Sequence, residues 1–105
     1  MERLYLITRR DLEPCDQAVQ TCHAALEYAA LHPGPSAAWR AASNTLAWLV
    51  VDDEQALLDL ARQADRRGLR HALFHEPDRA NELTAMALEP SARKLVRGLD
   101  LALQR

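Results

Sequence analysis

Apolar residues in this chain gather in short segments that are separated by longer stretches of mixed polarity. Residues 4–8 and 44–51 are almost wholly apolar, which predicts two neighbouring strands that are buried on both faces of a sheet. Residues 71–74 form a third, shorter apolar segment, and residues 83–88 alternate enough to predict a fourth strand.

Two longer segments have the apolar spacing of amphipathic helices. The first extends from Asp16 to about Leu31, with Pro14 in its first turn, and we expect it to bury a single stripe made of Val19, Cys22, Leu26 and Ala30. The second follows a capping residue in the acidic run 52–54 and ends at Gly68. Its buried stripe is expected to consist of Ala56, Leu57, Leu60, Ala61 and Ala64.

The other segments are a connection and a C-terminal helix. Residues 32–36, with two prolines and a glycine, end the first helix, and residues up to Ser43 predict a connecting segment with one short turn around Trp39. Pro90 and Ser91 start a last helix, whose buried side is expected to carry Leu95, Val96, Leu99 and Leu103.

The order of elements is therefore β-α-β-α-β-β-α, which is typical of the α/β class. Strands separated by helices imply parallel pairs with right-handed crossovers, whereas the short loop between the last two strands implies at least one antiparallel strand. We predict one domain, residues 1–105, built as a three-layer α/β/α sandwich on a mixed four-stranded sheet.

Composition narrows the function classes only slightly. The net charge of −2 does not indicate a general nucleic-acid binder, although all but one of the basic residues are arginine, so a local phosphate-binding patch stays open. No apolar run has the roughly 20 residues of a membrane helix. The N-terminal residues do not read as a secretory signal, and we expect a cytoplasmic protein.

The two cysteines do not predict a disulfide. Cys15 and Cys22 are expected on one helix face, two turns or roughly 10 Å apart, which is too far for a bridge. We interpret both as small buried hydrophobic residues, with a catalytic thiol as the weaker alternative. The sequence shows no zinc-ligand spacing and no glycine-rich phosphate loop, so we expect neither a metal nor a cofactor.

Two segments carry candidate chemistry. On the first helix, Gln20, His23 and Glu27 share one face, where the histidine is either an acid–base group or, as we favour, a hydrogen-bonded structural residue. The loop between the last two strands gathers three carboxylates, a histidine and an arginine, namely Glu76, Asp78, Glu82, His75 and Arg79. This loop is either a functional cluster or a solvated turn.

Together these segments resemble the type 2 (archaeal and eukaryotic-type) peptidyl-tRNA hydrolases. The similarity is carried by Arg-Asp-Leu at residues 10–12, Gln-x-x-His-Ala-Ala at residues 20–25 and Thr-Ala-Met-Ala-Leu-Glu-Pro at residues 84–90. The family shows an Arg-x-Asp-Leu strand end, an Ala-Gln-x-x-His-Ala helix and a Thr-Val-Leu-Gly-Ile-Gly-Pro strand in the same order. The resemblance extends over essentially the whole chain.

Several positions differ from the family's motifs. Asp16 stands where the family has the lysine of a Gly-Lys motif, which is thought to hold the substrate's phosphate or to polarise its ester. Glu76 aligns with the family's catalytic aspartate, Arg79 with its loop arginine and Ala80 with its loop threonine. The loops before the first helix and after Arg79 are shorter than in the family.

The resemblance implies hydrolysis of the ester bond between a peptide and the 3′ ribose of tRNA, in translation. This reaction needs an activated water, a group that polarises the carbonyl and cations for the phosphates. The expected catalytic residues are Glu76, Asp78 and His23. The expected substrate-binding residues are Arg9, Arg10, Asp16, Gln20, Arg79 and Thr84.

Two further hypotheses stay open. The first is a catalytically inactive member of the same fold that binds RNA or a protein partner, and the second is a small-molecule hydrolase or transferase. The resemblance also implies a homodimer, for which Trp39 and Trp48 are the expected contact residues. Whichever function holds, parallel first and third strands would bring the candidate site residues to one sheet edge, where ligands bind in open α/β sheets.

Overall fold

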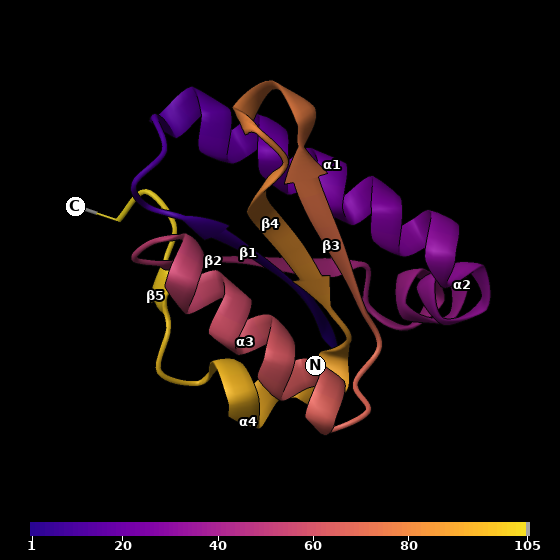
Figure 1. Ribbon diagram of the computed structural model, residues 1–105. Helices are drawn as coiled ribbons and strands as arrows, with labels where there is room; N and C mark the ends of the chain where they lie inside the picture. The colour runs from indigo at the N-terminus through magenta and orange to yellow at the C-terminus, as the bar shows by residue number, and fades with distance from the viewer. Residues whose placement is uncertain (105) are drawn as a thin grey trace.

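The computed structural model describes residues 1–104 and contains a five-stranded mixed sheet with helices on both faces (Figure 1). The strands lie in the order β3-β4-β1-β2-β5. They comprise β1 (Arg3–Arg9), β2 (Thr45–Val51), β3 (His71–Glu76), β4 (Glu82–Leu88) and β5 (Asp100–Leu101). The predicted α/β class and the mixed sheet are confirmed, and the predicted number of strands is one too low.

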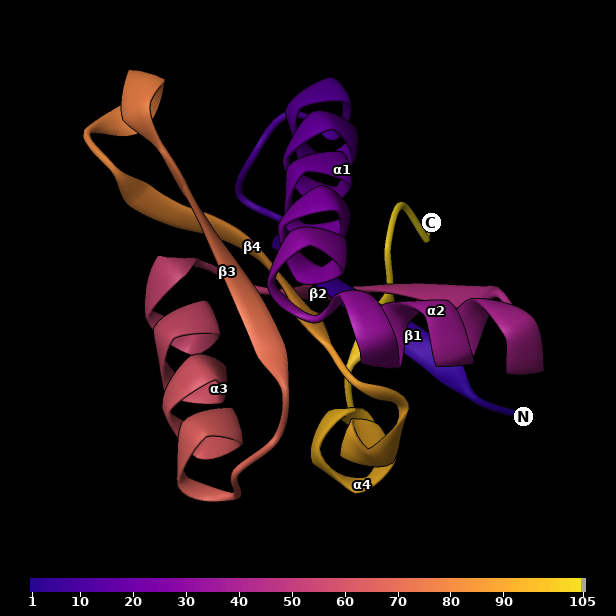
Figure 2. The ribbon, with the colours of Figure 1, turned by 90° about the vertical axis from the view of Figure 1, so that its right-hand side faces the viewer.

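The helices form the outer layers of the sandwich. They are α1 (Pro14–Leu31), α2 (Pro33–Ala42), α3 (Glu54–Arg66) and α4 (Arg93–Val96), with 3₁₀ turns at Pro77–Arg79 and Pro90–Ala92. One face of the sheet carries α1 and α2, and the other carries α3 and α4 (Figure 2). Among the helices of residues 1–104, none combines the length and apolarity needed to cross a membrane.

Strand directions bring three carboxyl ends to one edge of the sheet. β1 and β2 pair in parallel, with Arg3 opposite Thr45 and Arg9 opposite Val51. β4 runs antiparallel to both β1 and β3, so β3 is parallel to β1. The residues after β1, β2 and β3 therefore share an edge with the start of β4, as the sequence predicted for the first and third strands.

Successive side chains of each strand point to opposite faces of the sheet, where they pack into two separate cores. Leu4 and Leu6 of β1 pack with Tyr28 and Trp39 beneath α1 and α2. Tyr5 and Ile7 face the opposite core, which is larger and contains residues of α3 and α4. Because each face of β1 is covered, its continuous apolar sequence is explained, and the predicted burial of the first strand is confirmed. In the second strand the buried part is residues 49–51.

The buried face of α1 is the reverse of the predicted one. Val19 and Leu26 are 52% and 69% exposed, and both cysteines are exposed. The buried residues are instead Gln17, Gln20, Thr21, Ala24 and Tyr28. An alanine-rich helix has little contrast between its faces, and here hydrogen bonds make polar burial favourable: Gln17 Nε2 donates to Leu12 O at 2.8 Å, and Thr21 Oγ1 to Gln17 O at 2.7 Å.

Two other segments also differ from prediction. The connection after α1 is a further helix, α2, because its prolines occupy the first turn, where no amide hydrogen bond is lost. The predicted long C-terminal helix is only the short α4, after which the chain turns and pairs as β5 with β2. Leu103 is consequently 53% exposed rather than buried. Trp39 is buried, so it offers little of the contact area expected of it.

Substitutions on the two faces of α1 test its orientation. Tyr28→Ala should lower the free energy of unfolding by about 3 kcal/mol or more, since it removes a fully buried aromatic ring. Leu31→Ala, in the same helix, should change it by about 0.5 kcal/mol or less because that side chain is exposed. Urea unfolding of both variants measures this difference, and a larger loss for Leu31→Ala would contradict the observed packing.

Candidate functional site

A chain of polar side chains crosses the edge where β1, β3, β4 and α1 meet. Thr84 Oγ1, fully buried on β4, donates to Gln20 Oε1 at 2.6 Å. Gln20 Nε2 in turn donates to Glu76 Oε1 at 2.9 Å. The Thr84 backbone is itself bound, because Thr8 Oγ1 donates to its carbonyl at 3.0 Å. Three elements thus hold one carboxylate at the end of β3.

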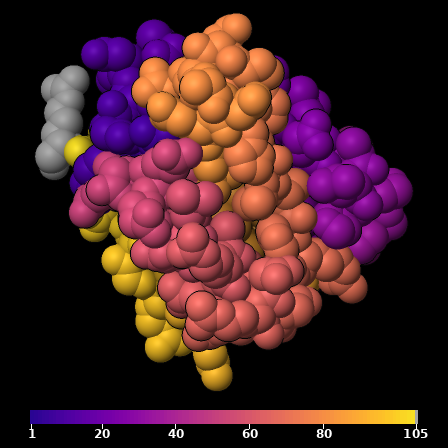
Figure 3. Space-filling view, in the orientation of Figure 1, coloured from indigo at the N-terminus to yellow at the C-terminus, as the bar shows by residue number. Residues whose placement is uncertain are grey.

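The loop after β3 completes the setting of Glu76. Its other carboxylate oxygen accepts the backbone N–H of Asp78 at 3.4 Å, and its carbonyl accepts the N–H of Asn81 at 3.0 Å. Ala80 and Asn81 both have positive φ angles, 53° and 60°, which reverse the chain tightly into β4. The loop forms a knob beside the start of α1 (Figure 3). The Glu76 side chain is half-buried and keeps access to solvent.

Arg9 is the buried cation of this edge. Its guanidinium is bound at 2.9 Å by Asp11 and at 2.8 Å by Glu82, and it also donates to Leu83 O at 3.2 Å. The hydrogen bond to Asp11, outweighing burial, raises the pKa of Arg9 above its ordinary value. The same bonds from Arg9 lower the carboxyl pKa values of Asp11 and Glu82. This ion-paired group ties β1 to the start of β4.

The other two expected arginines are also engaged by carboxylates. Arg79 lies 3.5 Å from Glu82, on the same carboxylate that binds Arg9. Arg10 points to a different part of the edge, where it bridges Asp52 at 2.9 Å and Asp100 at 2.8 Å. Its hydrogen bond to Asp100 raises the pKa of Arg10. Arg10 therefore links the ends of β1, β2 and β5 and does not join the Arg9 group.

The side chains of the remaining predicted residues lie around this network without entering it. His23 stacks on Phe74 with ring centroids 4.3 Å apart and planes 6° apart, so its contact with β3 lies two residues before Glu76. This packing against a strand is one part of the structural interpretation of His23, while the hydrogen bond that it also expected does not occur within residues 1–104. Asp16 is exposed in the first turn of α1, and Asp78 is exposed in the loop.

The edge as a whole is acidic. In the part of the chain that the structure describes, residues 1–104, the arginines of this edge are Arg9, Arg10 and Arg79, and all three are ion-paired. They are outnumbered by the carboxylates of the same loops and strand ends, which are Asp11, Glu13, Asp16, Asp52, Asp53, Glu54, Glu76, Asp78, Glu82 and Asp100. Phosphate groups would have to compete with these carboxylates for the three guanidinium groups.

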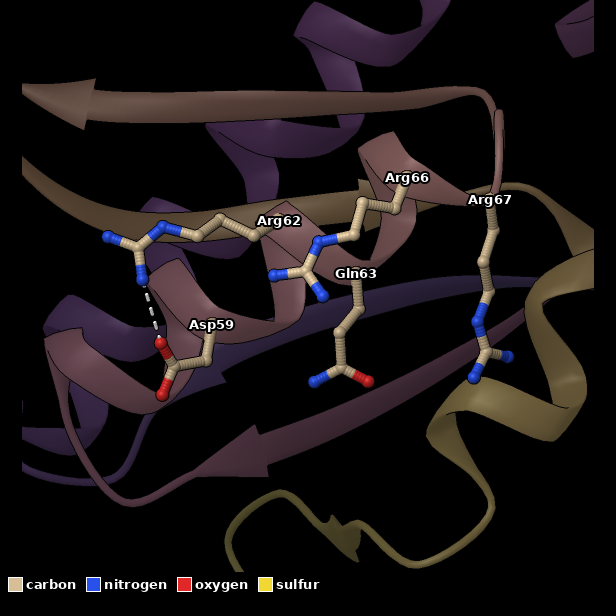
Figure 4. A pocket seen from close by; sticks show the side chains of 5 residues that line it. All are labelled: Asp59, Arg62, Gln63, Arg66 and Arg67. Atoms are coloured by element: carbon tan, nitrogen blue, oxygen red, sulfur yellow. Dashed lines mark hydrogen bonds and ion pairs between the residues drawn. The ribbon is translucent and has the colours of Figure 1, made fainter.

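No metal site accompanies the acidic edge in residues 1–104, where no group of His, Cys, Asp or Glu has the arrangement needed to hold a metal ion. The hollow of about 440 Å³ on α3 lies away from the edge and is formed by side chains of one helix surface (Figure 4). Within it, Arg62 pairs with Asp59 at 2.9 Å, while Gln63 and Arg66 extend separately. The polar network at Glu76 is therefore the better candidate site.

Sequence reasoning missed part of the network. Asp11 and Glu82 were visible as carboxylates at strand ends, and the Arg-x-Asp spacing of residues 9–11 was the available signal for the first ion pair. Thr8 and Phe74 gave no signal, because each acts through a residue distant in the sequence.

Comparisons with known proteins were made for the whole chain. A family model described as peptidyl-tRNA hydrolase PTH2 matches residues 3–104. A search among curated proteins gives no match. Among solved structures, a protein of unknown function from Agrobacterium tumefaciens matches with a TM-score of 0.69 and 18% sequence identity, over 94% of this chain and 96% of that chain. At this identity the structural likeness shows a shared fold.

Acid should destabilise the protein through the Arg9 ion pairs. Because the folded-state pKa values of Asp11 and Glu82 are lowered, their contribution is complete above the unfolded pKa of about 4 and is lost as pH falls through the folded values. Asp11→Asn should therefore flatten the fall in unfolding free energy between about pH 5 and pH 2. Asp65→Asn, a change at an exposed carboxylate of α3, is the control, and equal slopes for both variants would contradict the assignment.

Proposed function

This chain belongs to the peptidyl-tRNA hydrolase PTH2 family, and we propose that it hydrolyses the ester bond between the peptide and the tRNA of peptidyl-tRNA. The observation that supports this most directly is the Thr84–Gln20–Glu76 chain, which fixes a solvent-accessible carboxylate at the edge where open α/β sheets bind ligands. Since peptidyl-tRNA arises in translation, we propose that the chain acts in the cytoplasm.

Glu76 is the proposed general base. One of its oxygens accepts from Gln20 and the other accepts only a long bond from the loop, so lone pairs stay available for a water molecule. In the proposed reaction the water oxygen bonds to the ester carbonyl carbon while Glu76 takes the water's proton. The bond to the ribose oxygen then breaks, and Glu76 gives its proton to that oxygen as it leaves, which restores the carboxylate. Asp78, in the same loop, is the alternative carboxylate for this role.

The proposed substrate contacts come from the surrounding residues. Arg79 is 41% exposed and can turn from Glu82 toward a phosphate or the ester carbonyl. Gln20 positions Glu76, and His23 with Phe74 forms an aromatic surface beside it. In this proposal Arg9 does not bind phosphate directly. It holds Glu82 and the end of β1 in place beside the site. Arg10 and Asp16 keep their proposed binding role at the rim of the edge.

A second candidate function, binding without catalysis, is favoured by one specific observation. Each arginine at the edge is already held by a carboxylate. In addition, Asp16 puts a negative charge at the position where the type 2 peptidyl-tRNA hydrolases have a lysine. Such an edge has less capacity to stabilise negative charge on an ester carbonyl. A hydrolysis assay separates the two candidates, because only the first predicts release of peptide from peptidyl-tRNA.

Glu76→Gln tests the proposed base. Its amide cannot accept a proton from water, so hydrolysis of peptidyl-tRNA should fall by at least about a hundredfold. The unfolding midpoint should move little because Glu76 is only half-buried at the end of β3 and a glutamine oxygen can still accept the hydrogen bond from Gln20. Glu13→Gln, an exposed change at the start of α1, provides the control and should keep the activity of the unmodified chain. Full activity in Glu76→Gln would remove this carboxylate from the mechanism.

We also propose that the chain forms a homodimer through the outer face of α1. Cys15, Val19, Cys22 and Leu26 are exposed there at spacings of four, three and four residues, the pattern of a helix-pairing seam. Such an apolar stripe is unusual on an isolated monomer surface and marks an interaction site.

The dimer is tested by sedimentation at micromolar concentrations. The unmodified chain should sediment as a dimer, and Val19→Glu with Leu26→Glu should shift it to monomer by placing charge in the seam. Leu103→Glu introduces a charge at an equally exposed leucine outside the stripe and should leave the dimer intact. A monomeric unmodified chain would exclude this part of the proposal.

A further inference from the structure

A second groove lies on the face of the sheet that α4 covers only in part. It has a volume of about 530 Å³ and combines an apolar floor with three arginines. The floor is formed by Tyr5, Ala47, Leu49, Val96, Leu99 and Leu101. The groove exists because α4 ends at Val96 and the chain leaves as β5, so Ala47 of β2 stays partly open and Leu101 of β5 is 55% exposed.

The three arginines of the groove come from distant parts of the chain. Arg3 begins β1, whereas Arg93 and Arg97 flank α4, and folding brings them to the same groove. Within residues 1–104 their guanidinium groups form no ion pair, and no carboxylate lines the groove. Three like charges gathered without a counter-charge repel one another, and an anionic ligand would relieve that repulsion.

This distribution is the opposite of that at the Glu76 edge. There every arginine is neutralised by carboxylates, as Arg9 is by Asp11 and Glu82. The arginine hollow on α3 contains a carboxylate, since Asp59 binds Arg62 (Figure 4), and all its lining residues are polar or charged. Of these three places, the groove beside α4 alone combines an apolar floor with arginines that all lack a carboxylate partner within residues 1–104.

The floor determines what else the ligand must contain. Planar guanidinium groups bind phosphate oxygens in pairs, but an inorganic phosphate would leave most of a groove this size empty. Aliphatic side chains of β2 and β5 provide a surface for a flat apolar group. A nucleotide has both parts, because its phosphate can meet the arginines while its base covers the floor.

From this combination we infer that the groove between α4 and the β1–β2 face is a binding site for a nucleoside phosphate, either as a free nucleotide or as a unit of an RNA strand. Arg3 stands six residues from Arg9 along β1, so the Arg3 end of the groove lies about 20 Å from the Glu76 edge. One RNA molecule is long enough to contact both. The binding itself does not depend on hydrolysis at Glu76.

Calorimetric titration of the full chain tests the inference with three probes: adenosine monophosphate, inorganic phosphate and a single-stranded RNA of ten nucleotides. The double change Arg93→Gln and Arg97→Gln should weaken binding of the nucleotide or the RNA by about tenfold or more. The matched control Arg62→Gln and Arg66→Gln removes the same charge from α3 and should leave affinity within about twofold, because those residues lie outside the groove.

The probes also separate the two sources of the ligand. If RNA is the ligand, its affinity should exceed that of the mononucleotide, and the salt dependence should lose a slope of about 1.4 in the groove variant, roughly 0.7 for each lost phosphate contact. If a free nucleotide is the ligand, both should bind similarly. Leu101→Ser should weaken nucleotide binding and spare inorganic phosphate, since it alters only the floor.

Three results would overturn the inference: no binding of nucleotide or RNA, equal losses in the groove and α3 variants, or inorganic phosphate binding as tightly as the nucleotide. Hydrolysis of peptidyl-tRNA by the same unmodified chain is assayed separately from the binding of the probes. Binding of the probes without hydrolysis would contradict the proposed function alone. Hydrolysis without binding of the probes would contradict this inference alone.

Discussion

The position of β4 between β1 and β3 is the constraint on which the rest of the structure depends. β4 pairs antiparallel with both neighbours, and all its residues from Leu83 to Leu88 are at most 1% exposed. Because it runs against two strands that are parallel to each other, it brings the carboxyl ends of β1 and β3 to its own first residues. The Glu76 carboxylate, the Arg9 ion pairs and the buried end of Gln20 all meet at that point.

The polar groups at this point are interdependent. Burying Gln20 and Thr84 without partners would be costly, but each satisfies the other, and the chain ends on a carboxylate that reaches solvent. Arg9 is likewise buried only because Asp11 and Glu82 bind it. The buried Arg9 is therefore committed to the fold. Three arginines that have no ion pair within residues 1–104 lie instead at the groove beside α4, toward the start of β1.

The sequence predicts those strands and helices that are determined by residues close together in the chain. The β1 and β2 strands follow from continuous apolar runs. α3 follows its cap Asp53, whose carboxylate accepts the N–H of Ala56 at 2.9 Å, and it is followed by Gly68 at φ 65°. The shared edge follows from the parallel connections. The family resemblance, which the family match confirms, follows from motifs spread along the chain.

What the sequence could not show depends on contacts between distant residues. The buried face of α1 is set by two hydrogen bonds: the carbonyl of Leu12 accepts from Gln17, and the hydroxyl of Thr84 donates to Gln20. Helical periodicity reveals neither of them. The short α4 and the added β5 depend on pairing with β2 and on Arg10 binding Asp100. For the same reason Arg10 faces away from Arg9, although the two are adjacent in the sequence.

The central claim, that the ester end of peptidyl-tRNA binds at the Glu76 edge, is tested most directly by nuclear magnetic resonance with a non-hydrolysable peptidyl-adenosine amide. The account predicts that the largest shifts occur at the side-chain amide of Gln20 and the backbone amides of Asp78 and Asn81, which all bond to Glu76. Saturating binding that leaves these three amides unshifted, with the changes elsewhere on the molecule, would contradict it.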